Sequence, residues 1–228
     1  MFYYDPTYIL VLIGALISAI ASWNVNHSFE KYSRMSSGGR SGRDVAEAML
    51  RLAGIHDVRI EMVRGRLSDH YDPVHRVLRL SEGVYHSASI SAIGVAAHEC
   101  GHALQHKEGY LPLKLRSLSV PIANFGSWLS WPVILLGLIL GYGQLAQIGV
   151  ILFTLVVLFQ LITLPVEFNA SRRAMAALEG MGILAGEELD GAGKMLRAAA
   201  LTYVAALFAA ILQLLRLVLI VGGRRRRD

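Results

Sequence analysis

The segment 145–166 reads LAQIGVILFTLVVLFQLITLPV and is followed directly by Glu167; it is the clearest apolar run in the chain. An α-helix needs about 20 consecutive apolar residues to cross the hydrocarbon core of a bilayer. The segment is long enough and contains no charged side chain, so we predict that it spans a membrane. Glu167 then lies where the chain leaves the apolar layer.

The composition of the whole chain also indicates a membrane protein. Of its 228 residues, 54% are hydrophobic, and the mean hydropathy is +0.46, whereas a soluble domain is usually less apolar. Further apolar runs lie at 8–23, 118–141 and 198–221. We therefore predict a mostly α-helical membrane protein with about four transmembrane helices.

The net charge of +5 is concentrated beside the apolar runs and in Arg224–Arg227 at the end of the chain. This distribution favours contact with an anionic lipid surface, since nucleic-acid binding would require a basic face on a soluble domain. The single cysteine, Cys100, excludes an internal disulfide. We interpret Cys100 as a small buried residue of the core.

A short motif indicates metal chemistry. The segment 97–104 reads AHECGHAL and holds His98, Glu99 and His102 in His-Glu-x-x-His spacing. Helical side chains four apart share a face, so the two imidazoles can bind one metal ion. Neutral imidazole suits zinc, and a catalytic zinc site takes three protein ligands and one water. Glu99 can then accept the proton of that water.

The residues around this motif permit a helix. The segment 90–105 contains no proline, Ser89 or Ser91 can cap its start, and Gly109 can end it. The alternative is a helix with two ordinary histidines, because the motif also occurs by chance. His106 lies one turn further along, and we interpret it as a surface residue or as a support for the ligands.

The polar region before the motif has the pattern of a small α+β fold. Alternating residues predict strands at 57–63 and 75–81, and an edge strand could hold an extended substrate backbone. The segment 67–73 between them is predicted as a loop with an Asx turn; the other interpretation is that His70 or Tyr71 approaches the site and stabilises the transition state. Ser41 predicts the start of a helix that Gly54 ends, with an apolar face of Val45, Ala48, Met49 and Leu52.

The third metal ligand is predicted from membrane topology. The runs 118–141 and 145–166 form a hairpin, so the segment after it returns to the side of the membrane that carries the motif. We predict Glu167 as the third ligand; the alternative is a solvated acid at the end of a span. The other acids further along are interpreted as helix-end charges: Glu179, Glu187, Glu188 and Asp190.

Basic residues after the first run predict the orientation. By the positive-inside rule they place the following segment, and hence the metal site, in the cytoplasm, with the N-terminus outside; these residues are Lys31, Arg34, Arg40 and Arg43. If 198–221 crosses the membrane, Arg224–Arg227 lie outside, against this rule. A re-entrant last helix would remove the conflict.

These patterns divide the chain into consecutive parts. They are a first transmembrane helix (1–25), an α+β catalytic region (26–116), a transmembrane hairpin (117–166), a helix and connection carrying the third ligand (167–197), and a fourth transmembrane or re-entrant helix with a basic tail (198–228).

The chain resembles the YugP-like zinc-dependent membrane peptidases, a bacterial group of the gluzincin type. The resemblance rests on Tyr4-Asp5-Pro6, Lys31-Tyr32-Ser33, 67–73, 93–102, Asn124 with Leu129-Ser130-Trp131-Pro132, and 164–168. The layout is also similar to HtpX-type membrane proteases, in which two spans separate His-Glu-x-x-His from a Glu-x-x-Ala motif, here Glu167 to Ala170. Related enzymes often carry an acid shortly after the ligand glutamate, where this chain has Asn169 and Ser171. The resemblance implies a zincin-like catalytic domain in the bacterial plasma membrane.

Motif, topology and resemblance together predict a zinc-dependent membrane endopeptidase. It would hydrolyse peptide bonds of membrane or misfolded proteins near the bilayer surface, with zinc on His98, His102 and Glu167 and with Glu99 activating the zinc-bound water. The alternative is a non-catalytic scaffold or chaperone-like subunit with a structural zinc closed by a fourth protein ligand. A transporter is disfavoured, because the spans carry few polar groups.

Overall fold

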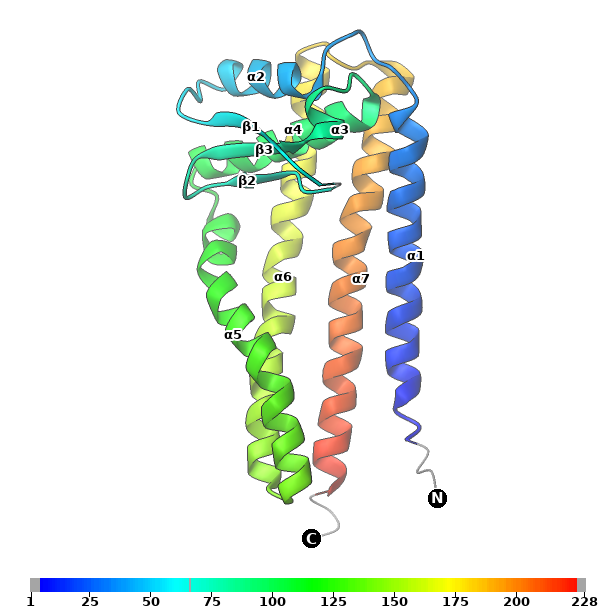
Figure 1. Ribbon diagram of the computed structural model, residues 1–228, viewed down its shortest axis with the longest axis vertical. Coiled ribbons are helices and arrows are strands. Elements are labelled where there is room, and N and C mark those ends of the chain that lie inside the picture. Colours follow the sequence, from blue (N-terminus) through cyan, green and yellow to red (C-terminus); the bar gives the residue numbers. More distant parts are fainter. Residues whose placement is uncertain (1–4, 66, 225–228) are drawn as a thin grey trace. The chain divides into compact units, whose positions relative to one another are not determined.

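The computed structural model describes residues 5–65 and 67–224. Its helices are α1 (Tyr8–Ser33), α2 (Gly42–Leu52), α3 (Glu82–Tyr85), α4 (Ile90–Lys107), α5 (Leu111–Leu140), α6 (Gly143–Gly180) and α7 (Gly186–Arg224), and its strands are β1 (Arg59–Val63), β2 (His70–Asp72) and β3 (Val77–Ser81) (Figure 1). The helices α1, α5, α6 and α7 are long and apolar enough to cross a membrane. The predicted mostly helical membrane protein with a small sheet is confirmed.

The long helices extend beyond the predicted apolar runs. α6 continues through Pro165 to Gly180 without a break, so Glu167 lies inside a helix and not after its end. α7 begins at Gly186, within the part 167–197 that was predicted as helix and connection. Arg66 and the basic residues Arg225–Arg227 lie outside the described residues.

Contacts divide the described chain into two compact units. The first comprises 1–21, 115–164 and 202–228, and the second comprises 22–114 and 165–201, each as far as it is described. The predicted metal-site residues of α4 and α6 all belong to the second unit.

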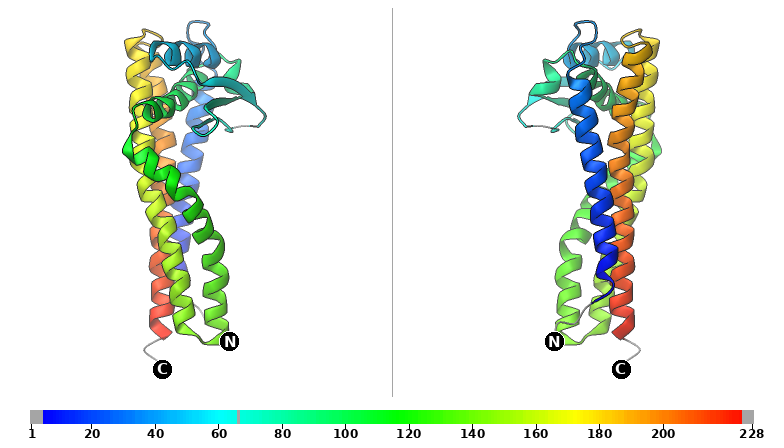
Figure 2. Two further views of the ribbon diagram at one scale, coloured as in Figure 1. Left: turned by 90° about the vertical axis from the view of Figure 1, so that its left-hand side faces the viewer. Right: turned by 90° about the vertical axis from the view of Figure 1, so that its right-hand side faces the viewer.

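Small residues bring the helices of the first unit together. The backbone of α5 at Gly137 is so close to Ala146 of α6 that an added Cβ would lie 2.4 Å from its nitrogen, and Gly14 of α1 similarly faces Ala209 of α7 at 3.2 Å. Such contacts are typical of helix packing in membranes, where apolar burial between helices gains little. α5 contains Pro121 and Pro132, and it bends along its course (Figure 2).

A buried charge joins the first and last helices of this unit. Arg216 of α7 is 9% exposed, its guanidinium donates to Asp5 Oδ2 at 3.2 Å, and it lies 4.1 Å from the centroid of the Tyr8 ring. An arginine within a span needs such an acidic partner. The contact links the start of α1 to the last third of α7.

The second unit contains a three-stranded sheet with the order β1-β3-β2. β1 pairs with β3 in parallel, and β2 pairs with β3 in antiparallel register, with Tyr71 opposite Leu78. The prediction that 67–73 is only a loop was wrong, because a three-residue strand is too short to show an alternating pattern. The predicted Asx turn is confirmed, since Asp72 Oδ1 accepts the N–H groups of Val74 and His75 at 3.0 and 3.1 Å.

The core of the second unit lies between α2, the sheet and α4. The capping box of Ser41 and Asp44 begins α2 as predicted, but the buried face differs from the predicted one, since Leu52 is 74% exposed. The buried stripe is instead Gly42, Val45, Ala46, Met49 and Leu50. The stripe is displaced because α2 packs closely on α3: a Cβ at position 42 would lie 2.4 Å from the carbonyl oxygen of Val84.

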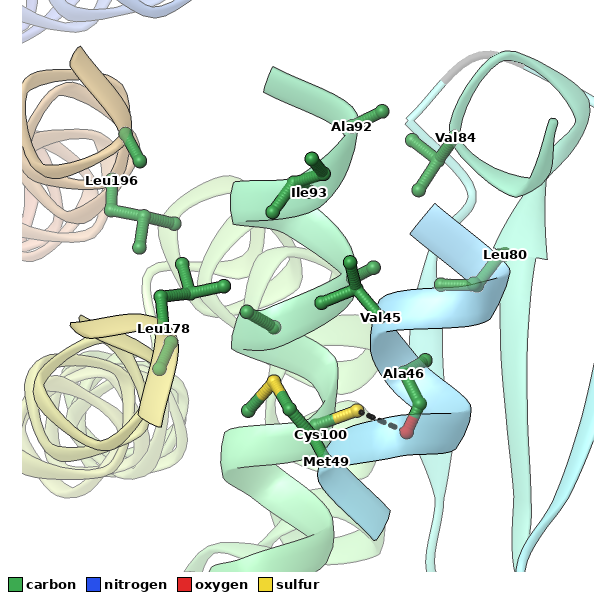
Figure 3. Packing of buried hydrophobic residues seen from close by; sticks show 14 of the residues in the cluster. Val45, Ala46, Met49, Leu80, Val84, Ala92, Ile93, Cys100, Leu178 and Leu196 are labelled. Carbon is green, nitrogen blue, oxygen red and sulfur yellow. Dashed lines mark hydrogen bonds between the residues drawn. The ribbon is translucent and has the colours of Figure 1, made fainter. Parts of the chain in front are cut away.

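Cys100 occupies the centre of this core, as predicted. It has no exposed surface, and its Sγ lies 3.7 Å from the carbonyl oxygen of Ala46. Figure 3 shows it between Ala46 and Met49 of α2, with Leu178 of α6 on the far side of α4. Burial raises the pKa of the Cys100 thiol, which keeps it protonated and inert.

The helix that carries the motif begins and ends as expected. Ser89 caps α4 by accepting the N–H of Ala92 at 3.2 Å, and Gly109 adopts the positive φ of +67° just after its end. Ser91, the other candidate cap, instead donates to the carbonyl oxygen of Phe29 at 2.8 Å. α4 therefore presents the motif on a helix that is fixed at both ends.

The approach of α4 to α6 depends on Gly101. A Cβ at this position would lie 2.5 Å from the carbonyl oxygen and 3.1 Å from the Cα of Ala170. Both are backbone atoms, so the two helices would have to move apart. Gly101 lies between the two motif histidines and its partner Ala170 lies one turn after Glu167, so the same contact sets the spacing of these side chains.

We predict that Gly101→Ala destabilises the protein by about 1–3 kcal/mol, because overpacking forces the backbones apart. The thermal unfolding midpoint of the detergent-solubilised protein measures this. The matched control is Gly83→Ala, because a Cβ there meets nothing within 4 Å. An unfolding midpoint for Gly101→Ala equal to that of the control would contradict the close approach.

Candidate metal centre

Three predicted side chains converge between α4 and α6. His98 and His102 come from α4 and Glu167 comes from α6, and their ligand atoms all lie within 4.8 Å of one another. Nε2 of His98 lies 3.2 Å from Glu167 Oε2, and Nε2 of His102 lies 3.6 Å from the same oxygen. Both imidazoles thus direct the same nitrogen atom toward one carboxylate oxygen.

The centre is largely closed to solvent. Glu167 is 1% exposed and His102 is 7% exposed, and the imidazole planes of His98 and His102 are nearly perpendicular, at 84° with centroids 4.8 Å apart. A carboxylate is costly to bury unless a cation or hydrogen-bond donors face it. The position of Glu167 therefore calls for positive charge at the point where the imidazoles meet it.

This donor set fits zinc. Imidazole nitrogens and a carboxylate oxygen bind zinc at about 2.0–2.2 Å in tetrahedral geometry, which separates ligand atoms by about 3.4 Å. The observed separations of 3.2 and 3.6 Å agree with this spacing. His98, His102 and Glu167 could hold such an ion with little rearrangement.

Glu99 lies beside the group and is held by the sheet. Its side chain is 9% exposed, and the backbone N–H of Tyr71 donates to Glu99 Oε2 at 2.9 Å. Tyr71 lies in β2, at the edge of the sheet. Its N–H therefore points away from β3 and toward α4, so the edge strand fixes the direction of the Glu99 carboxylate.

Of the other predicted site residues, the structure brings Tyr71 and His106 together. The Tyr71 hydroxyl and His106 Nδ1 share a hydrogen bond of 2.8 Å. Burial, with Asp72 adding to it, raises the pKa of Tyr71 to about 12, and burial together with Arg76 and Lys114 lowers the pKa of His106. At neutral pH the phenol is protonated and the imidazole is uncharged.

His70 faces the opposite side of β2. It is exposed, its Nδ1 lies 2.8 Å from the carbonyl oxygen of Ser68, and its Nε2 lies 3.3 Å from a guanidinium nitrogen of Arg79. Arg79 also binds Asp72 at 3.1 Å, and hydrogen bonds from His75, Arg79 and Val74 keep the pKa of Asp72 low. Side chains of neighbouring strand residues lie on opposite faces, which explains why the Tyr71 side chain reaches His106 and the His70 side chain does not.

Sequence reasoning missed the residues that contact the far nitrogen of each imidazole. Nδ1 of His98 lies 3.1 Å from Ser171 Oγ, and Nδ1 of His102 lies 3.1 Å from Gln105 Oε1. The only sequence signal for Gln105 is a polar residue one turn after His102 in an otherwise small and apolar helix. Ser171 lies one turn after Glu167, in the segment where the resemblance predicts an acid.

A cavity of about 440 Å³ borders Tyr71 and His106. The loop from Gly54 to Val58 forms one wall and the last turns of α4 form another, with Ala103 and Lys107. Lys107 donates to the carbonyl oxygen of Ala53, which ties this loop to α4. No local pattern in the sequence indicates the cavity, because distant segments form its walls.

Comparison with known proteins agrees with this geometry. The sequence profile of a family described as "putative neutral zinc metallopeptidase" matches residues 7–222. The chain therefore belongs to this family of zinc metallopeptidases.

A curated relative makes the assignment more specific. The chain is 50% identical over 220 residues to the "putative membrane protease YugP" of Bacillus subtilis (strain 168), an overlap of 95% of this chain and 98% of that protein. The resemblance to YugP-like peptidases expected from the motifs is confirmed. No solved structure matches the chain.

Removal of the Glu167 carboxylate is expected to weaken zinc binding. We predict that Glu167→Gln lowers zinc affinity by more than the roughly 10- to 100-fold that loss of an outer partner costs, because a charged ligand is removed. Chelator competition on the purified protein measures the affinity. Zinc should also raise the unfolding midpoint of the wild type and not that of the variant.

The matched control is Glu179→Gln, since Glu179 is an exposed acid of the same helix. Wild-type zinc affinity in Glu167→Gln would exclude this carboxylate from the metal centre.

Proposed function

We propose that the chain is a zinc-dependent, membrane-embedded endopeptidase whose zinc is held by His98, His102 and Glu167. The observation that carries the proposal is the approach of both Nε2 atoms to one oxygen of a carboxylate from a distant helix, at 3.2 and 3.6 Å. Zinc bound there would polarise a peptide carbonyl and lower the pKa of a coordinated water to about 7. Family membership supports the choice of metal.

In this proposal Glu99 is the general base. It accepts a proton from the attacking water and passes that proton to the amine that leaves when the peptide bond breaks. The hydrogen bond from Tyr71 supports this role, because it fixes a flexible side chain one residue away from a metal ligand. Its burial supports it as well, since general-base catalysis works best where bulk water is excluded.

The number of ligands favours catalysis over a structural zinc. Within residues 5–65 and 67–224, the group whose atoms could share one ion holds His98, His102 and Glu167 and no fourth histidine, cysteine or acid. Structural zinc sites are closed by four protein ligands, whereas catalytic sites keep one position open. This is the reason to prefer an enzyme to the scaffold or chaperone-like alternative.

We propose that the substrate is a membrane or misfolded protein that binds in extended form. The support is the position of β2, an edge strand whose Tyr71 contacts Glu99. An extended chain can pair with such an edge through backbone hydrogen bonds. The cavity beside Tyr71 offers room for a substrate side chain. The regions 26–116 and 167–197 would together form the catalytic part.

We also propose that the catalytic site faces the cytoplasm, close to the bilayer surface. The support is the basic cluster that begins with Lys31 in the last turn of α1 and continues with Arg34, and the position of Glu167 directly after the apolar run 145–166. An even number of crossings would leave both ends of the chain outside, which agrees with the contact of Asp5 with Arg216. The exported tail Arg224–Arg227 would then be an exception to the charge rule.

Removal of the base tests the proposed chemistry. We predict that Glu99→Gln binds zinc as the wild type does and loses about 10²- to 10⁴-fold in the rate of peptide hydrolysis, because the amide cannot accept the proton of the water. Zinc content and cleavage of an unfolded protein substrate by the purified, detergent-solubilised protein are measured together. The control is Glu187→Gln, which changes an exposed acid at the start of α7.

Two results would count against the proposed enzyme. Cleavage by Glu99→Gln at the wild-type rate would exclude Glu99 as the base. Zinc that is bound with a fourth protein ligand, in a wild type that cleaves nothing, would favour the scaffold.

A further inference from the structure

Gln105 is a polar side chain buried next to the metal centre. It has no exposed surface, and a buried amide left without hydrogen bonds costs about 1–3 kcal/mol for each unmet group. Its amide contacts Nδ1 of His102 at 3.1 Å, the carbonyl oxygen of Val166 at 2.8 Å and Oδ1 of Asn169 at 2.9 Å. Gln105 therefore bridges α4 to the turn of α6 that carries Glu167.

The chemistry of its neighbours dictates which way the amide points. The guanidinium of Arg173 can only donate, and its Nε lies 2.7 Å from Asn169 Oδ1. This end of Asn169 is therefore its oxygen, an acceptor. The carbonyl oxygen of Val166 is also an acceptor. Two acceptors face the same end of Gln105, so that end is its NH₂ group, and its oxygen Oε1 faces His102.

The orientation of Gln105 in turn dictates where His102 carries its hydrogen. An amide oxygen can only accept, so Nδ1 of His102 is the N–H donor in its 3.1 Å contact with Gln105. Glu167 Oε2 faces Nε2 at 3.6 Å and also only accepts, so the two acceptors compete for the single hydrogen of a neutral ring, and the shorter contact favours Nδ1. In the neutral ring the lone pair then lies on Nε2, the nitrogen 3.6 Å from Glu167 Oε2. This is the tautomer in which Nε2 can bind a metal.

We propose that Gln105 is a positioning residue that selects the tautomer and ring orientation of His102, and that Asn169 and Arg173 set the orientation of Gln105. The proposal rests on the proposed role of His102 as a metal ligand. Arg173 is the outermost residue of this hydrogen-bonded chain, and it is held in place because both carboxylate oxygens of Glu108 accept from it, at 2.6 and 2.7 Å. The hydrogen-bonded chain therefore runs from the Arg173–Glu108 ion pair, at the end of α4, through Asn169 and Gln105 to His102.

His98 provides an internal comparison. Its Nδ1 lies 3.1 Å from the hydroxyl of Ser171, and a hydroxyl can either donate or accept. Ser171 thus supports the ring of His98 without dictating its tautomer. The two histidines should therefore respond differently when their partners are removed.

The test measures the tautomer directly in the metal-free, full-length protein labelled with ¹⁵N-histidine. Long-range ¹H–¹⁵N spectra distinguish the Nδ1–H, the Nε2–H and the doubly protonated ring, and loss of signals in His102→Asn assigns His102. We expect the Nδ1–H form at His102 in the wild type and a shift toward the Nε2–H form, whose hydrogen faces Glu167, in Gln105→Leu. Zinc affinity of Gln105→Leu, from chelator competition, should fall about 10- to 100-fold.

A second variant separates tautomer selection from simple bridging of the helices. Gln105→Glu keeps an acceptor for His102 and loses the donor to Val166 and Asn169. We expect it to retain the Nδ1–H form even though its unfolding midpoint falls, and it carries the test if Gln105→Leu fails to fold. Gln144→Leu is the matched control, since Gln144 is exposed on α6.

The Nδ1–H form with wild-type zinc affinity in Gln105→Leu would overturn the proposal, as would loss of that form in a folded Gln105→Glu. Failure of the proposed enzymatic function is a separate outcome, because the tautomer is measured without metal or substrate. A wild type that cleaves nothing but holds His102 in the Nδ1–H form would leave the positioning role supported.

Discussion

The second unit depends on one constraint, the burial of the Glu167 carboxylate against two imidazole nitrogens. Glu167 is 1% exposed, and an unpaired carboxylate in such surroundings would lose several kcal/mol of solvation. A cation bound where His98 and His102 face the same oxygen would offset this cost, and that requires α4 and α6 to stay close. Helix packing and metal-site geometry are therefore one requirement, and no part of the centre can be moved independently of the helix that carries it.

The close packing that meets this requirement is made by small residues. α4 has Ala97, Gly101 and Ala103 on buried positions, and α6 offers Ala170 and Ala174, which are fully buried. Their lack of bulk lets backbones touch, as at Gly101 and Ala170. These short side chains cannot form hydrogen bonds with buried polar atoms. The few polar residues on this contact therefore form hydrogen bonds with one another, as Gln105 and Asn169 do.

The sequence was sufficient where the signal is local or where topology is simple. The spacing of His98 and His102 and the caps of α4 lie within a few residues, and two apolar runs in succession predict a hairpin that returns Glu167 to the motif. It was insufficient where partners lie far apart in the chain. β2 exists only because β3 pairs with it, and the close approach of α3 to α2 at Gly42 depends on a contact between separate elements. The buried surroundings of Gln105 likewise follow from contacts with α6 alone.

The absence of charge on Asn169 has a physical consequence. A carboxylate after Glu167 would place further negative charge beside a buried one, whereas Asn169 contributes only a dipole. The guanidinium of Arg173 binds Asn169 and Glu108. Arg173 therefore orients the amides that lie between it and His102, while its positive charge stays away from the imidazole. A cation placed directly against the imidazole would oppose a bound metal ion. The two neutral amides between Arg173 and His102, those of Asn169 and Gln105, thus orient the imidazole without placing a further charge beside the proposed metal centre.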